Sequence, residues 1–185
     1  LTHMVKTVFR WDVVEHGIPE KREDDRCLLC RGGWPISVIS SSDVAIEITA
    51  NYYNSLFVFE DEHNEKFRNK RPEVFKMILK SYARNISTEA ALQTILDDVR
   101  QKNDRTMDIK TLNSYLDALN DLYIIEDMDA WNPEIRSKTA IRTTPTRHFV
   151  DTSIACRALG IGPDDLMHDL PSFGLFFEDM AVRDL

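Results

Sequence analysis

Apolar residues recur at helical spacing in several stretches of this chain, and polar clusters, glycines and prolines separate these stretches. The clearest apolar stripe lies over residues 108–123, where leucines and tyrosines share one helical face behind Asp108. A second stripe begins at Pro72, a residue suited to the first turn of a helix, and a third covers residues 92–99. We therefore expect three amphipathic helices in the middle of the chain.

The residues after the third of these helices favour extended structure. The run Tyr-Ile-Ile at 123–125 consists of strand-forming residues, Pro133 interrupts the pattern, and residues 147–150 are placed to return as a second strand. Two helices followed by a hairpin form the outline of a winged helix. We expect this unit over residues 87–151.

The outer parts of the chain also carry helical patterns. We expect a short helix over residues 26–31 that ends at Gly32, and a long helix over residues 43–59. Three short helices are expected after residue 151, over residues 154–159, 164–170 and 173–185. The predicted fold class is mostly α: a helical bundle with a winged-helix unit, meaning a helix-turn-helix plus a β-hairpin wing.

This pattern divides the chain into four parts: a lead-in, a helical subdomain, the winged-helix-like unit and C-terminal helices, expected at residues 1–25, 26–86, 87–151 and 152–185. We interpret residues 1–4 as a tag remnant, and we expect a further domain to follow residue 185.

Composition and charge narrow the class of protein. The 185 residues are 43% hydrophobic, enough for a real core, and the formal net charge is −8. A protein with this net negative charge is not expected to bind nucleic acid or anionic membrane with its whole surface. The sequence has no apolar run long enough for a transmembrane helix, and its first residues do not resemble a signal peptide. Three cysteines, an odd number, fit a reducing cytoplasm better than a disulfide framework, so we expect a cytoplasmic protein without a membrane partner.

Cations gather in the predicted wing and could contact the phosphates of nucleic acid. These candidate contact residues are Arg136, Lys138, Arg142, Arg147 and His148.

The second helix of the winged-helix-like unit adds Lys110 and Asn113 as candidate contacts. Three acidic residues on the same helix, Asp108, Asp117 and Asp121, would repel phosphates. We therefore favour a unit that packs against another domain or protein, with binding of DNA as the alternative.

No other pattern in the sequence predicts chemistry. Cys27 and Cys30 have the spacing of zinc ligands, but no second pair of ligands follows, and we interpret both as small buried residues. Asp151 is interpreted as a helix cap. A hydrolase would need His148 and Asp151 to converge in a pocket. We predict no catalytic, cofactor-binding or metal-binding residue in this chain.

Several runs of the chain, taken together and in order, resemble a known family. They are Cys-Arg-Gly-Gly-Trp-Pro (30–35), Ser-Tyr-Ala-Arg-Asn-Ile-Ser-Thr (81–88), Ile-Glu-Asp-Met-Asp-Ala-Trp-Asn-Pro (125–133), Ile-Arg-Ser-Lys (135–138), Arg-His-Phe-Val-Asp (147–151) and Phe-Gly-Leu-Phe-Phe-Glu-Asp-Met-Ala-Val-Arg-Asp-Leu (173–185). They resemble the C-terminal half of predicted bacterial AAA-type ATPases, which carry a domain of unknown function after the ATPase core.

This resemblance implies an N-terminal P-loop module, a winged-helix-like middle and a C-terminal part similar to restriction-endonuclease folds. It also implies that the full-length protein binds ATP and Mg²⁺. The present chain contains no Gly-x-x-x-x-Gly-Lys-Ser/Thr run, so it lacks the loop that cradles a nucleotide phosphate. We expect a non-catalytic C-terminal fragment that couples the missing ATPase domain to a partner or target, and the alternative is a stand-alone winged-helix regulator that binds DNA.

Overall fold

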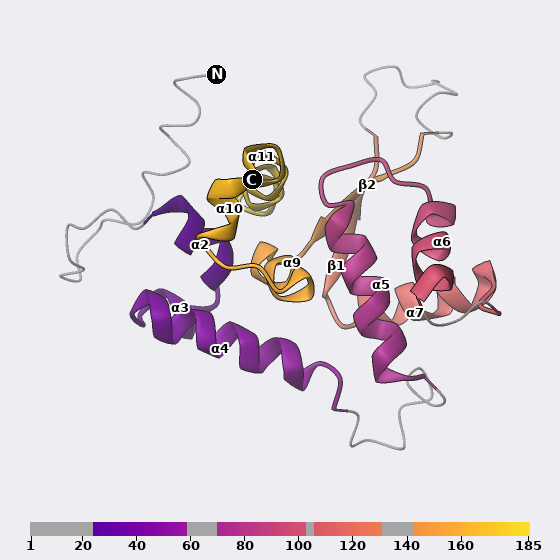
Figure 1. The fold of residues 1–185 in the computed structure, drawn as a ribbon, viewed down its shortest axis with the longest axis horizontal. Helices are drawn as coiled ribbons and strands as arrows, with labels where there is room; N and C mark the ends of the chain where they lie inside the picture. The colour runs from indigo at the N-terminus through magenta and orange to yellow at the C-terminus, as the bar shows by residue number, and fades with distance from the viewer. Residues whose placement is uncertain (1–23, 59–69, 103–105, 131–142) are drawn as a thin grey trace.

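A computed structural model describes residues 24–58, 70–102, 106–130 and 143–185. In these ranges the protein is mostly helical and contains one two-stranded antiparallel sheet (Figure 1). The elements in chain order are α2 (Asp25–Arg31), α3 (Pro35–Val38), α4 (Ser42–Ser55), α5 (Pro72–Arg84), α6 (Leu92–Lys102), α7 (Ile109–Asp121), β1 (Ile125–Met128), β2 (Thr146–Phe149), α9 (Thr152–Leu159), α10 (Asp165–His168) and α11 (Leu170–Arg183).

The ends of the helices follow from local chemistry. Pro72 occupies the first turn of α5, where its missing N–H costs no hydrogen bond. The Asp108 carboxylate accepts a hydrogen bond from the backbone N–H of Thr111 at 2.7 Å and caps α7. Helix α9 begins at the cap Asp151 and ends at Gly160, which adopts the left-handed conformation with φ +72°.

The sheet is a hairpin with a short extension. Strands β1 and β2 pair antiparallel, with Ile125 opposite Phe149. On the other edge of β2, the backbone N–H of Ser87 donates to the carbonyl of Arg147 at 2.8 Å, and the N–H of Arg147 donates to the carbonyl of Thr88 at 3.0 Å. The loop between α5 and α6 therefore pairs with β2 on the edge that β1 leaves open.

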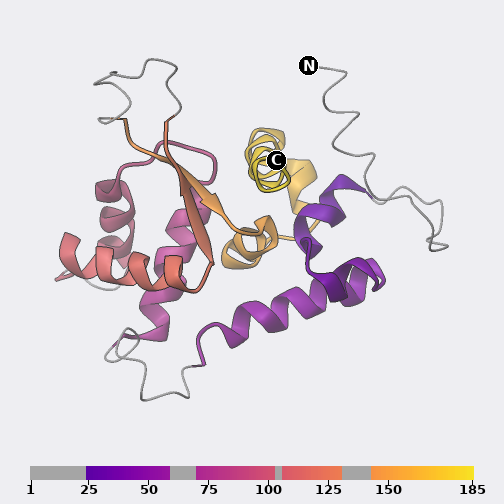
Figure 2. The ribbon, with the colours of Figure 1, turned by 180° about the vertical axis from the view of Figure 1, so that it is seen from behind.

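Helix α9 lies at the centre of the molecule. Figures 1 and 2 show it between the half formed by α5, α6, α7 and the hairpin and the half formed by α2, α3, α4, α10 and α11. It contacts α2, α4, α5, α11 and β2. One continuous cluster of buried apolar side chains joins the two halves, so packing runs across the expected boundaries at residues 86 and 151. The division into subdomains stays a prediction.

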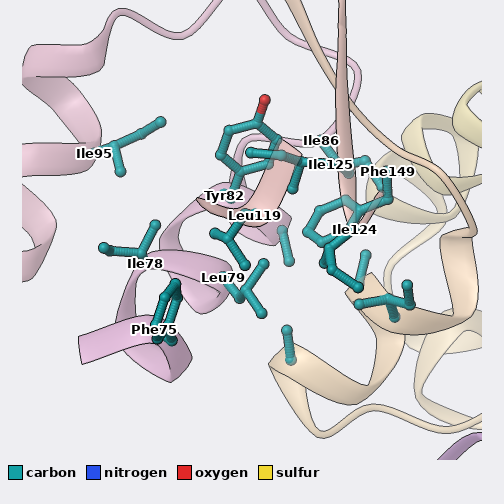
Figure 3. Close-up of a cluster of buried hydrophobic side chains, with 14 of the residues drawn as sticks. Phe75, Ile78, Leu79, Tyr82, Ile86, Ile95, Leu119, Ile124, Ile125 and Phe149 are labelled. Atoms are coloured by element: carbon teal, nitrogen blue, oxygen red, sulfur yellow. The ribbon is translucent and has the colours of Figure 1, made fainter. Parts of the chain in front are cut away.

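Part of this cluster lies between α5 and the hairpin (Figure 3). Tyr82 of α5 and Phe149 of β2 are fully buried, and their rings meet edge to face at a centroid distance of 5.5 Å. The expected apolar stripe of α5 is confirmed, since its members are all buried: Val74, Phe75, Ile78, Leu79 and Tyr82.

Most expected elements are present, with shifted ends. The long helix over residues 43–59 is α4, which ends at Ser55, and the hairpin matches the two predicted strands. The sequence does not predict helix α3, because its four residues are too few to show periodicity. The mostly helical class is confirmed. Among the described helices, none is long and apolar enough to cross a membrane.

Candidate functional site

The polar residues of the interior are concentrated where β2 leads into α9. Within residues 147–153, five polar or charged residues are at most 5% exposed: Arg147, His148, Asp151, Thr152 and Ser153. Burying polar groups costs free energy unless they find partners. This segment is therefore the first candidate for a site, and its partners decide what it can do.

The first set of partners surrounds Asp179 of α11, which is 1% exposed. Its Oδ1 accepts hydrogen bonds from Nδ1 of His148 at 3.0 Å and from the backbone N–H of Phe149 at 2.9 Å. Its Oδ2 accepts from the hydroxyl of Thr152 at 2.6 Å. These three hydrogen bonds offset the free-energy cost of burying the Asp179 carboxylate. They also connect α11 to β2 and to the first turn of α9.

The second set surrounds Asp151. Its Oδ1 accepts from the backbone N–H of Ser153 at 2.9 Å and from the Ser153 hydroxyl at 2.5 Å. Its Oδ2 accepts from the backbone N–H of Gly33 at 2.8 Å and from Nη1 of Arg183 at 2.9 Å. The indole N–H of Trp34 donates to Ser153 Oγ at 3.1 Å. The expected helix cap is confirmed, and the same carboxylate also holds the α2–α3 connection and the end of α11.

The third set surrounds Arg147. Its guanidinium forms an ion pair with Asp127 of β1, donates from Nε to the carbonyl of Ala90 at 2.9 Å, and lies 5.9 Å from the centroid of the Tyr82 ring. The Tyr82 hydroxyl donates to the other oxygen of Asp127. Burial raises the pKa of the Asp127 carboxyl, against the opposing effect of the Arg147 charge. This set connects the hairpin to α5 and to the segment just before α6.

These hydrogen bonds and ion pairs show that two residues of the expected contact surface are buried. The sequence predicts Arg147 and His148 as exposed wing cations, but each is 3% exposed and bonded inside the protein. Both faces of β2 are covered, because Arg147 lies against Tyr82 of α5 while His148 lies against Asp179 of α11. Consecutive residues of one strand can therefore both be buried.

The other predicted contact residues have different places. Lys110 and Asn113 are exposed on α7, as a contact role would require. Arg136, Lys138 and Arg142 lie outside the described residues. The structure therefore brings none of the wing residues that it describes together with Lys110 and Asn113 in one exposed surface.

The arrangement needed for a hydrolase is not formed by His148 and Asp151. His148 bonds to Asp179, while Asp151 bonds to Gly33, Ser153 and Arg183. The Nε2 atom of His148 is buried and has no hydrogen-bond partner among the described residues. A general base needs a proton within hydrogen-bond reach, and no described nucleophile supplies one.

The described residues also provide little for metal binding or for catalysis by a thiol. Cys30 and Cys156 are fully buried and Cys27 is half-buried, which fits the interpretation of small core residues for Cys30. The Cys156 thiol lies 3.7 Å from the carbonyl oxygen of Leu29, so α9 and α2 meet at this point. Within the described ranges, no group of three His, Cys, Asp or Glu side chains could hold a metal ion.

A shallow cavity of about 290 Å³ lies where the end of α5 meets α9, α10 and α11. Its lining includes the apolar residues Ile86, Leu166 and Phe176. Arg84, at its edge, forms an ion pair with Asp98 at 3.2 Å, and Asp169 caps α11 through Ser172. Asp165, the other charged residue of the lining, accepts a hydrogen bond from the backbone N–H of Gly162 at 2.8 Å. Each charged group at this cavity therefore already has a partner within the chain.

Sequence reasoning missed the partners that organise the interior, namely Asp127, Asp179 and Arg183. A signal was present for Asp179, since it falls three residues after Phe176 on the face of α11 that packs inward. A carboxylate on an apolar helix face indicates a buried partner elsewhere in the chain.

Comparison with known proteins gives one match. Over residues 22–165 the chain matches the model of a family described as Domain of unknown function (DUF8612). No curated protein and no solved structure matches the chain. The family description mentions no ATPase, so the resemblance to AAA-type ATPases stays a prediction. Since the match covers most of its length, the chain belongs to the family with this domain of unknown function, DUF8612.

Proposed function

We propose that this chain is a non-catalytic interaction module in which a winged-helix unit contacts a protein rather than DNA. By the family resemblance described above, its role would be to couple an ATPase domain to a partner or target in the cytoplasm. ATP and Mg²⁺ would then belong to the ATPase domain and not to this chain.

The order and pairing of the elements support the winged helix. Three helices, α5 to α7, precede the hairpin, and residues 87–88 pair with the free edge of β2. A winged helix places a short strand between its first two helices and pairs it with the hairpin in this manner. In such a unit α7 is the helix that would enter the major groove of DNA.

The observation that carries the choice of a protein partner is the charge on the exposed face of α7. Three carboxylates stand on or directly before this helix, and one ammonium group, Lys110, opposes them. The carboxylates are Asp108, Asp117 and Asp121. Attraction to phosphates supplies nearly all non-specific affinity for DNA, and a face with this balance repels phosphates.

The buried polar residues support a role without catalysis. Hydrogen bonds join the side chains of Asp151, Asp179 and Arg147 to groups of the same chain. These bonds connect elements that are distant in sequence. Polar groups used in this way specify the fold instead of a reaction.

Fluorescence anisotropy with a labelled DNA duplex tests the choice between protein and DNA. We expect no binding tighter than about 1 µM at physiological salt, the strong end of ordinary non-specific affinity under that condition. Binding that is tighter than this, weakens with salt and is reduced by Lys110→Glu would overturn the proposal and favour the DNA-binding regulator. Asp117→Lys is the matched variant, because it should strengthen a true DNA contact at the same helix face.

The coupling to an ATPase has a separate test. The gene is sequenced on both sides of the region that encodes these residues. A Walker A motif upstream would support the coupling role, and a stop codon soon after residue 185 together with no upstream P-loop would overturn it.

A further inference from the structure

Two of the three cysteines meet in the interior of the protein. Cys30 of α2 and Cys156 of α9 are both 0% exposed. Their helices pack against each other (Figure 1), and the Cys156 thiol lies 3.7 Å from the carbonyl oxygen of Leu29, the residue before Cys30. The two thiols are also in hydrogen-bonding contact with each other. The fold therefore brings together two sulfur atoms that are far apart in the sequence.

This placement allows a disulfide bond without a large rearrangement. Two sulfur atoms in hydrogen-bonding contact become bonded when rotation of the side chains brings them roughly 2 Å closer. Cys156 would give up its contact with the Leu29 carbonyl, which costs little because a thiol is a weak hydrogen-bond donor. The bond would join α2 to α9, the helix at the centre of the molecule.

The surroundings give the two thiols different chemical roles. The Cys156 thiol, and to a smaller extent the charge of Arg157, lower the pKa of Cys30 against the effect of burial. The Cys30 thiol and burial raise the pKa of Cys156 well above its ordinary value. Cys30 is thus the thiol that more readily becomes a thiolate, the form that reacts with oxidants. Cys156 is in place to react second.

We propose that Cys30 and Cys156 form a redox-sensitive pair that hydrogen peroxide converts to a disulfide between α2 and α9. The Cys30 thiolate attacks one oxygen of the peroxide, the O–O bond breaks, and Cys30 becomes a sulfenic acid. The sulfur of Cys156 then attacks the sulfur of this sulfenic acid, and the S–O bond breaks. The two thiols lose two electrons and two protons in total, and the peroxide is reduced to two molecules of water.

Burial makes this reaction slow. Neither sulfur is open to solvent, so peroxide reaches the pair only when α2 separates locally from the rest of the protein. Helix α2 has seven residues, too few for a helix that is stable by itself, so its local opening does not require the whole fold to open. Once formed, the disulfide keeps α2 against α9. The oxidised chain should therefore be the more stable form.

Peptide mapping of the whole chain after treatment with hydrogen peroxide tests this proposal. The remaining thiols are blocked with N-ethylmaleimide in urea, and the chain is digested with trypsin without reductant. Trypsin places Cys27 and Cys30 together in the peptide 27–31, and Cys156 in the peptide 148–157. We expect these two peptides to be joined by a disulfide that dithiothreitol breaks. The melting temperature should rise on oxidation and return on reduction.

Cys27 provides the matched control, because it lies in the same peptide and is half-buried. Cys27→Ser should form the joined peptides as fast as the unchanged chain, and Cys30→Ser should not form them. Cys156→Ser should leave a sulfenic acid on Cys30 that dimedone traps. Circular dichroism shows whether each variant is folded, and the unchanged chain together with Cys27→Ser decides the question if either of the other two is not.

Three results would overturn the proposal. In the first, peroxide oxidises Cys27 while the peptide 148–157 stays unjoined. In the second, the joined peptides disappear in Cys27→Ser and persist in Cys30→Ser. In the third, they form in urea but not in the native protein, since the fold would then not bring the two thiols together.

Discussion

The carboxylate of Asp179 in α11 accepts a hydrogen bond from Nδ1 of His148 in β2, a residue 31 positions earlier in the chain. The same carboxylate binds the backbone N–H of Phe149 and the hydroxyl of Thr152. Through this one side chain, the last helix is joined to the hairpin and to the central helix α9. The interior polar groups of the protein therefore act as connections between elements.

Removing this carboxylate should destabilise the fold strongly. Asp179→Ala leaves three buried donors without their acceptor, and we expect the free energy of unfolding to fall by about 3 kcal/mol. Asp179→Asn retains one oxygen acceptor and should cost less. Urea denaturation measures both. Glu178→Ala, next to it but exposed, should change the free energy by less than about 0.5 kcal/mol. Equal effects of the Asp179 and Glu178 variants would contradict this view of the interior.

The local pattern of the sequence was enough to predict many elements of this fold. The stripe of α5, the start of a helix at Asp108 and the hairpin depend on residues close together in the chain, and all three are present. The burial of Arg147 and His148 depends on Asp127 and Asp179, which come from other elements. The sequence alone does not show these partners, so it leads to the interpretation of Arg147 and His148 as exposed cations of a wing. Periodicity carries no information about such distant pairs.

Two glycines with nearly equal φ angles allow the effect of steric crowding to be measured. Gly32 has φ +71° and Gly160 has φ +72°. A Cβ atom added to Gly32 would lie 2.3 Å from Oδ1 of Asp151, whereas one added to Gly160 would meet nothing within 4 Å. Gly32 also has ψ −177°, in a backbone region that is nearly restricted to glycine, while Gly160 has the ordinary left-handed value of 32°.

Gly160→Ala should therefore cost about 1 kcal/mol of unfolding free energy, the penalty for a left-handed residue with a side chain. Gly32→Ala should cost at least about 3 kcal/mol, because strain and the displacement of Asp151 are added. Thermal denaturation followed by circular dichroism compares the two variants. If they melted at the same temperature, the close approach of Asp151 to Gly32 would not hold in solution.

The pH dependence of the cap of α2 can be predicted from Asp24. Hydrogen bonds from the side chain and the backbone N–H of Arg26 lower the pKa of Asp24 from 3.8 to about 2. Between these two pH values the unfolded chain binds more protons at this site than the folded chain does, so stability rises with pH. The contribution of Asp24 is complete above about pH 4 and is lost as the pH falls through about 2.

A carbon-detected NMR titration of the Asp24 carboxyl should give a midpoint near the lower value. In Arg26→Gln the midpoint should return toward 3.8, the ordinary value for this carboxyl. An unchanged midpoint in this variant would show that Arg26 is not the cause of the shift.

The three cysteines should differ in reactivity. The neighbouring Cys30 thiol and burial raise the pKa of Cys156 well above its ordinary value, and the thiolate is the reactive form. Cys30 is also fully buried, while Cys27 is half-buried. Iodoacetamide should therefore modify Cys27 first in the native protein and all three cysteines in urea. Mass spectrometry over time follows each site, and early modification of Cys156 would contradict the packing of α9 against α2.

Tyr123 presents a strained backbone with an exposed side chain. It follows the last turn of α7 with φ +54°, and the residue is 76% exposed. The N–H of Ile124 donates to the carbonyl of Leu119 and the N–H of Tyr123 to that of Asn120, which is the Schellman pattern that usually places glycine or asparagine at this position. A tyrosine in the left-handed region costs about 1 to 2 kcal/mol. Ser87 has a similar φ of +55°, but its N–H and hydroxyl both form hydrogen bonds with other elements.

Tyr123→Asn should therefore raise the free energy of unfolding by about 0.5 to 1 kcal/mol, because asparagine tolerates the left-handed region and little apolar burial is lost. Ser87→Asn is the matched comparison. It should lower the free energy instead, since the serine hydroxyl donates to the carbonyl of Leu175 at 2.9 Å. Urea denaturation of both variants measures the two signs. A loss of stability in Tyr123→Asn would mean that the tyrosine ring stabilises the fold through contacts stronger than its exposure indicates.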